Sequence, residues 1–178
     1  MIHSLYLDMD GVLVFQHKIL ADLCSMSEVE FETKVKSFTD KKEKEAFIIP
    51  LILESVKTEG FITAPPTPFY YEILKLIPYW QSKGISVEIL SSAMSANSYN
   101  DEIIRQKKMW LKQYNLDNLQ AHFPLGSKLK QTYATPFSLL IDDYDRNISQ
   151  WQSQQGIGIL HTDTATTLKE LNKYGLNL

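Results

Sequence analysis

Three short apolar runs, each followed directly by acidic or hydroxyl side chains, constrain the fold of this chain more than any other feature. They are residues 4–7 before Asp8-Met9-Asp10-Gly11, residues 85–90 before Ser91-Ser92, and residues 137–141 before Asp142-Asp143. Their length suits buried strands, and segments with apolar residues at helical spacing separate them. Strands that alternate with helices predict an α/β fold, with a parallel sheet flanked by helices.

The polar residues after these runs are expected to meet at one site, because open parallel sheets bind ligands just beyond the carboxyl ends of their strands. The expected site contains Asp8, Asp10, Ser91, Ser92, Asp142 and Asp143, with Lys128 or Lys130 as a nearby cation. Four carboxylates repel one another unless a hard divalent cation such as Mg²⁺ lies among them. Since a hydroxyl and a lysine also suit phosphate oxygens, the set predicts a phosphoryl-transfer site.

Each of these motifs also has a simpler structural interpretation when it is taken alone. Asp10-Gly11 is typical of a tight β-hairpin turn. Paired serines often end a strand or cap a helix, and Asp142-Asp143 is common in turns. The order in which the motifs occur, each after an expected strand, favours the catalytic interpretation.

Residues 15–64 differ in composition and residue pattern from the rest of the chain. Charged residues are dense there, and apolar side chains recur at helical spacing at Val29, Phe31, Val35 and Phe38. We interpret this stretch as a small helical cap inserted after the first strand, with 1–14 and 65–178 as the α/β core. Pro50 should break or kink a helix of the cap.

The core helices carry recognisable ends. Thr67-Pro68 predicts a helix start, because threonine suits the N-cap and proline suits the first helical position. Asn100 is expected to cap a second helix in the same way. Residues 156–161 are expected to form the last strand, and residues 164–174 the last helix.

Composition and charge exclude several classes of protein. The 178 residues are 44% hydrophobic and 22% charged, which is typical of globular domains. A net charge of −3 offers no electrostatic basis for nucleic-acid or membrane binding. The single cysteine, Cys24, forms no intrachain disulfide and no cysteine-based zinc site. Because no membrane span or signal peptide is evident, we expect a cytoplasmic protein.

The ordered motifs resemble those of the haloacid dehalogenase superfamily of phosphohydrolases, over residues 4 to about 165. Asp8-x-Asp10-Gly11-Val12 is similar to the first motif, Ser91 to the second, Lys130 to the third and Asp142-Asp143 to the fourth. DMDGVL, together with LIDDYDRNI and a following tryptophan, most resembles the cytosolic 5′(3′)-deoxyribonucleotidases and their bacterial and phage relatives. The chain departs from that family at Val14-Phe15, where Ala-Asp-Phe is common, and Lys128 remains an alternative to Lys130.

The resemblance implies a covalent mechanism with Mg²⁺ as cofactor. Asp8 would attack phosphorus to form an aspartyl-phosphate, and Asp10 would protonate the leaving oxygen and later accept a proton from water. Asp8, the backbone carbonyl of Asp10 and Asp142 would bind Mg²⁺. Asp143 would hold a metal-bound water or position the motif lysine.

The same resemblance assigns the phosphate and substrate contacts. Ser91, Ser92 and Lys130 would hold the phosphoryl oxygens. The cap would cover the site, as caps do in this superfamily, and would select the substrate. Phe15 and His17, which follow the first motif, are the expected substrate contacts from this region.

The leading functional hypothesis is a Mg²⁺-dependent 5′-nucleotidase that acts on (deoxy)nucleoside monophosphates. Two alternatives remain: a phosphatase of another small phosphomonoester or of nucleic-acid 3′-phosphate ends, and a catalytically idle binding protein with the same fold. The near-neutral charge weighs against the nucleic-acid substrate. The apolar residues of the cap could equally pack the core of a monomer or the interface of a homodimer.

Overall fold

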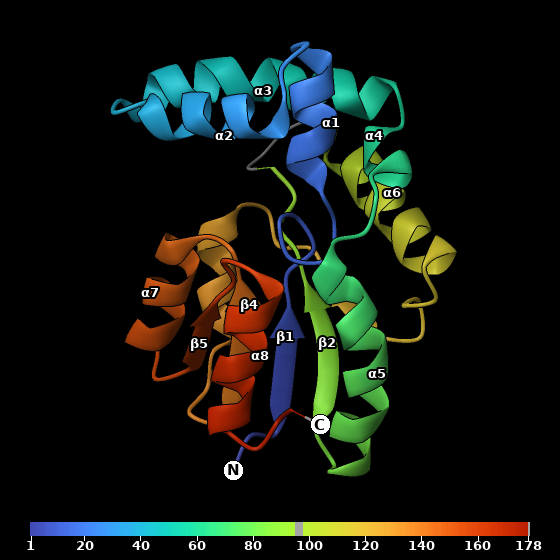
Figure 1. The fold of residues 1–178 in the computed structure, drawn as a ribbon, viewed down its shortest axis with the longest axis vertical. Helices are drawn as coiled ribbons and strands as arrows, with labels where there is room; N and C mark the ends of the chain where they lie inside the picture. Colours follow the sequence, from blue (N-terminus) through green and yellow to red (C-terminus); the bar gives the residue numbers. More distant parts are fainter. Residues whose placement is uncertain (95–97, 178) are drawn as a thin grey trace.

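A computed structural model describes residues 1–94 and 98–177, apart from the side chain of Lys41. Its centre is a five-stranded sheet in which every neighbouring pair is parallel, in the order β3-β2-β1-β4-β5 (Figure 1). The strands are β1 (Ser4–Leu7), β2 (Ser86–Leu90), β3 (Gln120–His122), β4 (Ser138–Asp142) and β5 (Ile157–Leu160). The predicted α/β fold with a parallel sheet flanked by helices is therefore confirmed.

The register of the three central strands aligns their carboxyl ends. Leu7, the last residue of β1, pairs with Ile89 of β2 on one side and with Ile141 of β4 on the other. The residues that follow the three strands therefore lie along one edge of the sheet.

Helices cover both faces of the sheet. They are α5 (Pro68–Ser82), α6 (Asn100–Gln113), α7 (Asp145–Ser153), α8 (Thr164–Lys173) and the 3₁₀ helix η1 (Ser127–Tyr133). Side chains alternate along β1, as strand geometry requires. Leu5 and Leu7 belong to a core cluster with Phe69 of α5, whereas Tyr6 belongs to a second cluster with Trp151 of α7.

A layer of four helices lies beyond the carboxyl edge of the sheet (Figure 1). They are α1 (Gln16–Leu23), α2 (Glu28–Ser37), α3 (Lys41–Lys57) and α4 (Gly60–Thr63), and we call them the cap. Leu20, Ala21, Phe31 and Val35 form an apolar core of the cap's own. The cap is thus a packed unit that covers the edge where the candidate site residues gather.

The structure differs from some local expectations. Helix α3 is not broken at Pro50, because Phe47 and Leu51 pack against the cap core and offset the hydrogen bond that proline cannot make. Val29 is 76% exposed, so it is not part of that core. Asn100 is the first residue of α6 and not its cap, which is Tyr99.

Other expectations hold. Thr67 caps α5 by accepting a hydrogen bond from the backbone N–H of Tyr70, and Pro68 is the first helical residue. The sequence pattern did not predict β3, which has three residues, or η1. Within the described residues, no helix is long and apolar enough to cross a membrane.

Candidate active site

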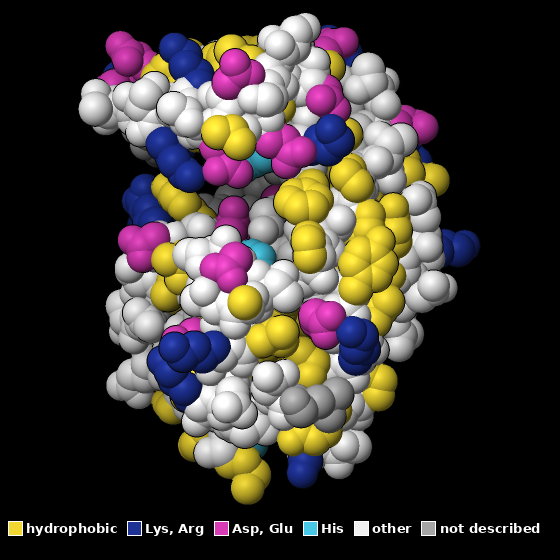
Figure 2. All heavy atoms as spheres, viewed as in Figure 1, with side chains coloured by type: hydrophobic (Ala, Val, Ile, Leu, Met, Phe, Trp, Pro, Cys, Tyr) yellow, Lys and Arg dark blue, Asp and Glu magenta, His cyan; other side chains and the backbone are white. Residues whose placement is uncertain are grey.

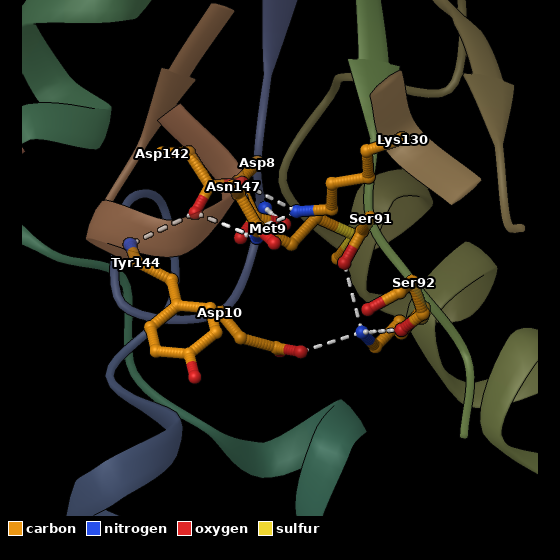
Figure 3. Close-up of polar contacts among 10 residues, drawn as sticks. Asp8, Met9, Asp10, Ser91, Ser92, Lys130, Asp142, Tyr144 and Asn147 are labelled. Atoms are coloured by element: carbon orange, nitrogen blue, oxygen red, sulfur yellow. Dashed lines mark hydrogen bonds and ion pairs between the residues drawn. The ribbon is translucent and has the colours of Figure 1, made fainter. Parts of the chain in front are cut away.

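Most of the side chains expected at the sheet edge lie near one another in the structure, and Figure 3 shows Asp8, Asp10, Ser91, Ser92, Lys130 and Asp142. Asp8 follows β1, Ser91 follows β2, and Asp142 ends β4. All three are buried. The segment after Asp8 does not form a hairpin, because the backbone N–H groups of residues 12–14 all donate to the carbonyl of Met9 in a compact loop. This loop brings Asp10 back to the same edge.

Lys130 links the ends of two strands. It projects from η1, is 2% exposed, and places its Nζ 2.9 Å from Asp8 Oδ2 and 2.7 Å from Asp142 Oδ2. Burial alone would lower the pKa of Lys130, but the carboxylates of Asp8 and Asp142 outweigh it and raise that pKa. The ammonium therefore stays charged at neutral pH. Lys128, two residues earlier, is exposed.

Two further groups fix the carboxylate of Asp142. The backbone N–H of Tyr144 donates to Oδ1 over 2.9 Å, and the amide of Asn147 in α7 donates to both carboxylate oxygens over 2.9 and 3.0 Å. Sequence reasoning missed Asn147. The signal available was its place five residues after Asp142, inside the helix that follows the strand.

Three carboxylates form a donor set for a cation. Asp8, Asp142 and Asp143 each offer an oxygen, and these atoms lie within 4.8 Å of one another. Burial, followed by the charges of Asp8 and Asp142, raises the pKa of Asp143 well above its usual range. Burial and Asp8 likewise raise the pKa of Asp142. Mg²⁺ prefers carboxylate oxygens, and its charge would offset the repulsion that makes ionisation of these crowded groups unfavourable. The three residues therefore fit that ion.

Gly11 allows Asp143 to approach the first loop. A Cβ at this position would collide with the Asp143 carboxylate. Gly11 also has φ = +77°, a conformation that favours glycine. Glycine is thus required here by both space and backbone geometry.

Replacing Asp143 with asparagine should raise the Tm of the metal-free protein at pH 7. The variant removes a carboxylate whose pKa is raised in the folded state, and about 1 kcal/mol corresponds to roughly 2–4 °C for a chain of this size. The gain should vanish as the pH falls below about 4, where Asp143 is protonated in both folded and unfolded protein. Thermal unfolding in EDTA at several pH values measures this.

The control is Asp117→Asn, which changes an exposed aspartate.

Mg²⁺ should raise the Tm of the wild-type protein more than that of the Asp143 variant, because an ion that binds only the folded state stabilises it. A Tm that falls in the Asp143 variant would contradict the electrostatic explanation.

Lys107 is a second buried lysine at the site, and sequence reasoning missed it. It comes from α6, and its Nζ lies 2.6 Å from Asp10 Oδ2 and 2.8 Å from Ser91 Oγ. Its position four residues after Ile103 and three before Trp110 places it on the buried stripe of that helix. The signal in the sequence was a lysine at a position where the helical spacing predicts a buried apolar residue.

Two cavities open between the cap and the core, where Figure 2 shows a hollow that contains acidic and histidine side chains. We name them by their aspartates. The Asp10 cavity has a volume of about 530 Å³ and includes Ser92. The Asp143 cavity has a volume of about 570 Å³ and includes Phe15 and His17. The expected substrate contacts Phe15 and His17 therefore lie on the Asp143 side.

No protein-family model and no curated protein matches this sequence. Solved structures, however, match it over most of its length. A HAD-superfamily hydrolase of subfamily IA, variant 1, from Geobacter sulfurreducens PCA aligns with a TM-score of 0.52 and 10% identity, covering 89% of this chain and 86% of that chain. The chain has the haloacid dehalogenase fold.

Two dehalogenases share this haloacid dehalogenase fold. One is the L-2-haloacid dehalogenase of Xanthobacter autotrophicus with chloropropionic acid covalently bound, at a TM-score of 0.51 and 10% identity, covering 100% of this chain and 85% of that chain. The other is a dehalogenase that aligns with a TM-score of 0.53 and 12% identity, covering 90% of this chain and 85% of that chain. The likeness concerns the fold, and the chemistry rests on this chain's own side chains.

Proposed function

We propose that this protein is a Mg²⁺-dependent phosphomonoesterase that acts through an aspartyl-phosphate on Asp8. The observation that carries the proposal is the pairing of two carboxylates with two separate lysines at one sheet edge. Asp8 contacts Lys130, and Asp10, two residues later, contacts Lys107. A nucleophile and a separate acid–base group are what a two-step displacement requires.

In the first step the Asp8 carboxylate attacks phosphorus, the new P–O bond forms, and the bond to the leaving oxygen breaks. Asp10 gives its proton to that oxygen. In the second step water attacks the same phosphorus, and Asp10 accepts a proton from that water. The bond between phosphorus and Asp8 breaks, which releases inorganic phosphate and restores the Asp8 carboxylate. Asp142 and Asp143, with Asp8, would hold Mg²⁺, which when bound neutralises charge on the phosphoryl oxygens.

Ser91 and Lys130 are placed to hold the phosphoryl group. Ser91 Oγ accepts a hydrogen bond from Lys107, so its own O–H is left to donate to a phosphoryl oxygen. Lys130 contributes a positive charge beside Asp8. Ser91 follows β2 and Lys130 comes from η1, so both groups belong to the core and not to the cap.

The position of Asp10 indicates where the leaving group lies. A proton donor must be within hydrogen-bond reach of the leaving oxygen, so the leaving group occupies the Asp10 cavity. Ile48, Ile49, Ile52 and Phe61 of the cap line this cavity, with Tyr144 from the core. A volume of about 530 Å³ lies within the range of small-molecule sites. We therefore favour a (deoxy)nucleoside monophosphate, whose base would lie against these apolar side chains.

The dehalogenases of the same fold give a second candidate function. The Xanthobacter enzyme has chloropropionic acid covalently bound, and a covalent intermediate on Asp8 would suit dehalogenation as well as phosphate hydrolysis. Halide is a leaving group that needs no proton, whereas an alkoxide does. The lysine-held Asp10 and the carboxylates of the Mg²⁺ donor set favour phosphate esters.

The proposal is tested by assaying phosphate release from ribo- and deoxyribonucleoside 5′- and 3′-monophosphates and from an aryl phosphate, with Mg²⁺ and with EDTA. We expect release that depends on Mg²⁺, is lost in EDTA, and is greatest for nucleotides. Halide release from 2-haloacids is measured in parallel, and Asp8→Asn protein controls for contaminating phosphatase. If only an aryl phosphate is hydrolysed, the proposed reaction stands, but nucleotides are rejected as the substrates. Halide release without phosphate release would replace the proposal with dehalogenation.

A further inference from the structure

The ammonium of Lys107 is buried among three oxygen acceptors. Lys107 is 1% exposed, and its Nζ donates to Asp10 Oδ2 over 2.6 Å, to Ser91 Oγ over 2.8 Å and to the backbone carbonyl of Ser92 over 3.0 Å. An ammonium group has three donors, so every one of them is used. Lys107 therefore has no donor left for a phosphoryl oxygen.

The rest of α6 fixes this ammonium in place. Gln106, the preceding residue, donates its side-chain amide to the backbone carbonyl of Val56 in the cap over 2.7 Å. The Lys107 Nζ lies 5.4 Å from the ring centroid of Phe61, also in the cap. The helix that carries Lys107 is thus held against both the cap and the sheet edge.

Lys107 makes the two oxygens of Asp10 different. Oδ2 accepts the hydrogen bond from the ammonium, whereas Oδ1 is buried and has no hydrogen-bond partner among the residues that the structure describes. The ammonium therefore fixes the orientation of the Asp10 carboxyl group through Oδ2. Asp10 also lines the cavity assigned above to the leaving group.

We propose that Lys107 is a positioning residue for proton transfer, which holds the carboxyl group of Asp10 at the cavity assigned to the leaving group. This inference rests on the proposed phosphomonoesterase function. As the bond from phosphorus to the leaving oxygen breaks, the proton moves from the carboxyl group of Asp10 to that oxygen, and Lys107 keeps all three of its protons. Lys107 acts through Asp10 and does not bind the phosphoryl group.

The test compares Lys107→Met with the wild-type protein on two esters with different leaving groups. We use kcat/KM, which covers the chemistry up to departure of the leaving group. For an alkyl phosphate, whose alkoxide needs a proton, kcat/KM should fall by about 100-fold. For 4-nitrophenyl phosphate, whose leaving group needs little protonation, it should be almost unchanged. Lys108→Met, which changes the exposed neighbouring lysine, is the matched control.

Two further measurements separate positioning from phosphate binding. In an Asp10→Asn background, Lys107→Met should cause no further loss, because residues that act through one another are not additive. The inhibition constant of inorganic phosphate should be the same in Lys107→Met as in the wild-type protein. An equal loss on both esters, an additional loss in the double variant, or weaker phosphate inhibition would each overturn the proposal.

The outcome for Lys107 remains distinct from the outcome for the proposed function. If the wild-type protein hydrolyses neither ester, the phosphomonoesterase proposal fails. A crystal structure of Lys107→Met then tests the positioning role by itself, because the Asp10 carboxylate should leave its wild-type position, and an unmoved carboxylate would reject the role. If the methionine variant does not fold, Lys107→Gln keeps two N–H donors and should show a smaller loss with the same dependence on the leaving group.

Discussion

Replacing Asp8 with asparagine should abolish phosphate release from every ester that the wild-type protein hydrolyses, a loss of about 10⁴-fold or more. An amide is a far weaker nucleophile than a carboxylate, and no aspartyl-phosphate can form on it. The residual rate is measured as phosphate release over hours at high protein concentration. The variant and the wild-type protein are purified in parallel.

The Asp8 variant should nevertheless fold. Asparagine has nearly the shape of aspartate, and Lys130 keeps its contact with Asp142, 2.7 Å away. Loss of one ion pair is offset by relief of the repulsion that Asp8 exerts on Asp142 and Asp143. We therefore expect a Tm within a few degrees of the wild-type value and an unchanged far-ultraviolet circular dichroism spectrum. Residual turnover that is well above background in folded variant protein would reject Asp8 as nucleophile.

The residues at the sheet edge can be predicted from the sequence because each follows its strand directly. A short apolar run that ends in Asp8, Ser91 or Asp142 is a local pattern. Parallel pairing then brings the three strand ends together, as the alignment of Leu7 with Ile89 and Ile141 demonstrates. No further long-range information is needed to place these side chains at one edge.

Lys107 and the cap contacts cannot be predicted in this way, because they depend on how helices pack. Lys107 lies 97 positions from Asp10 along the chain, and their contact exists only once α6 docks on the core. Within the cap, Val29 lies two positions before Phe31 and so points away from the face that Phe31 and Val35 share. The spacing of apolar residues in the sequence does not by itself distinguish the exposed face that carries Val29 from the buried face that carries Phe31 and Val35.

Replacing Lys130 with methionine should impair both stability and catalysis. Removing one partner of a buried charge pair typically costs about 3–5 kcal/mol, because the remaining charge is buried without compensation. Asp142 is 0% exposed, so its carboxylate would bear most of this cost. The rate should fall by about 10²–10³-fold, the usual effect of removing one group that stabilises charge in the transition state.

The matched control is Lys128→Met, which removes an exposed lysine from the same 3₁₀ helix. This control should be close to wild type in denaturant midpoint and in rate. The comparison also decides between the two lysines that the sequence left open. If Lys128→Met were the damaging change and Lys130→Met were neutral, the contacts of Lys130 with Asp8 and Asp142 would not be those of the working site.

The pH dependence of this destabilisation follows from the sign of the pKa shift at Asp142. Burial and Asp8 already raise that pKa in the folded state, and loss of the ammonium would raise it further. The penalty is then fully present above the raised folded-state pKa and disappears as the pH falls below the unfolded value of about 3.9. Denaturant unfolding of both proteins from pH 7 to pH 4 should therefore show a difference in stability that shrinks on acidification. A difference that is constant over this range would mean that lost packing of the lysine side chain, and not its charge, causes the destabilisation.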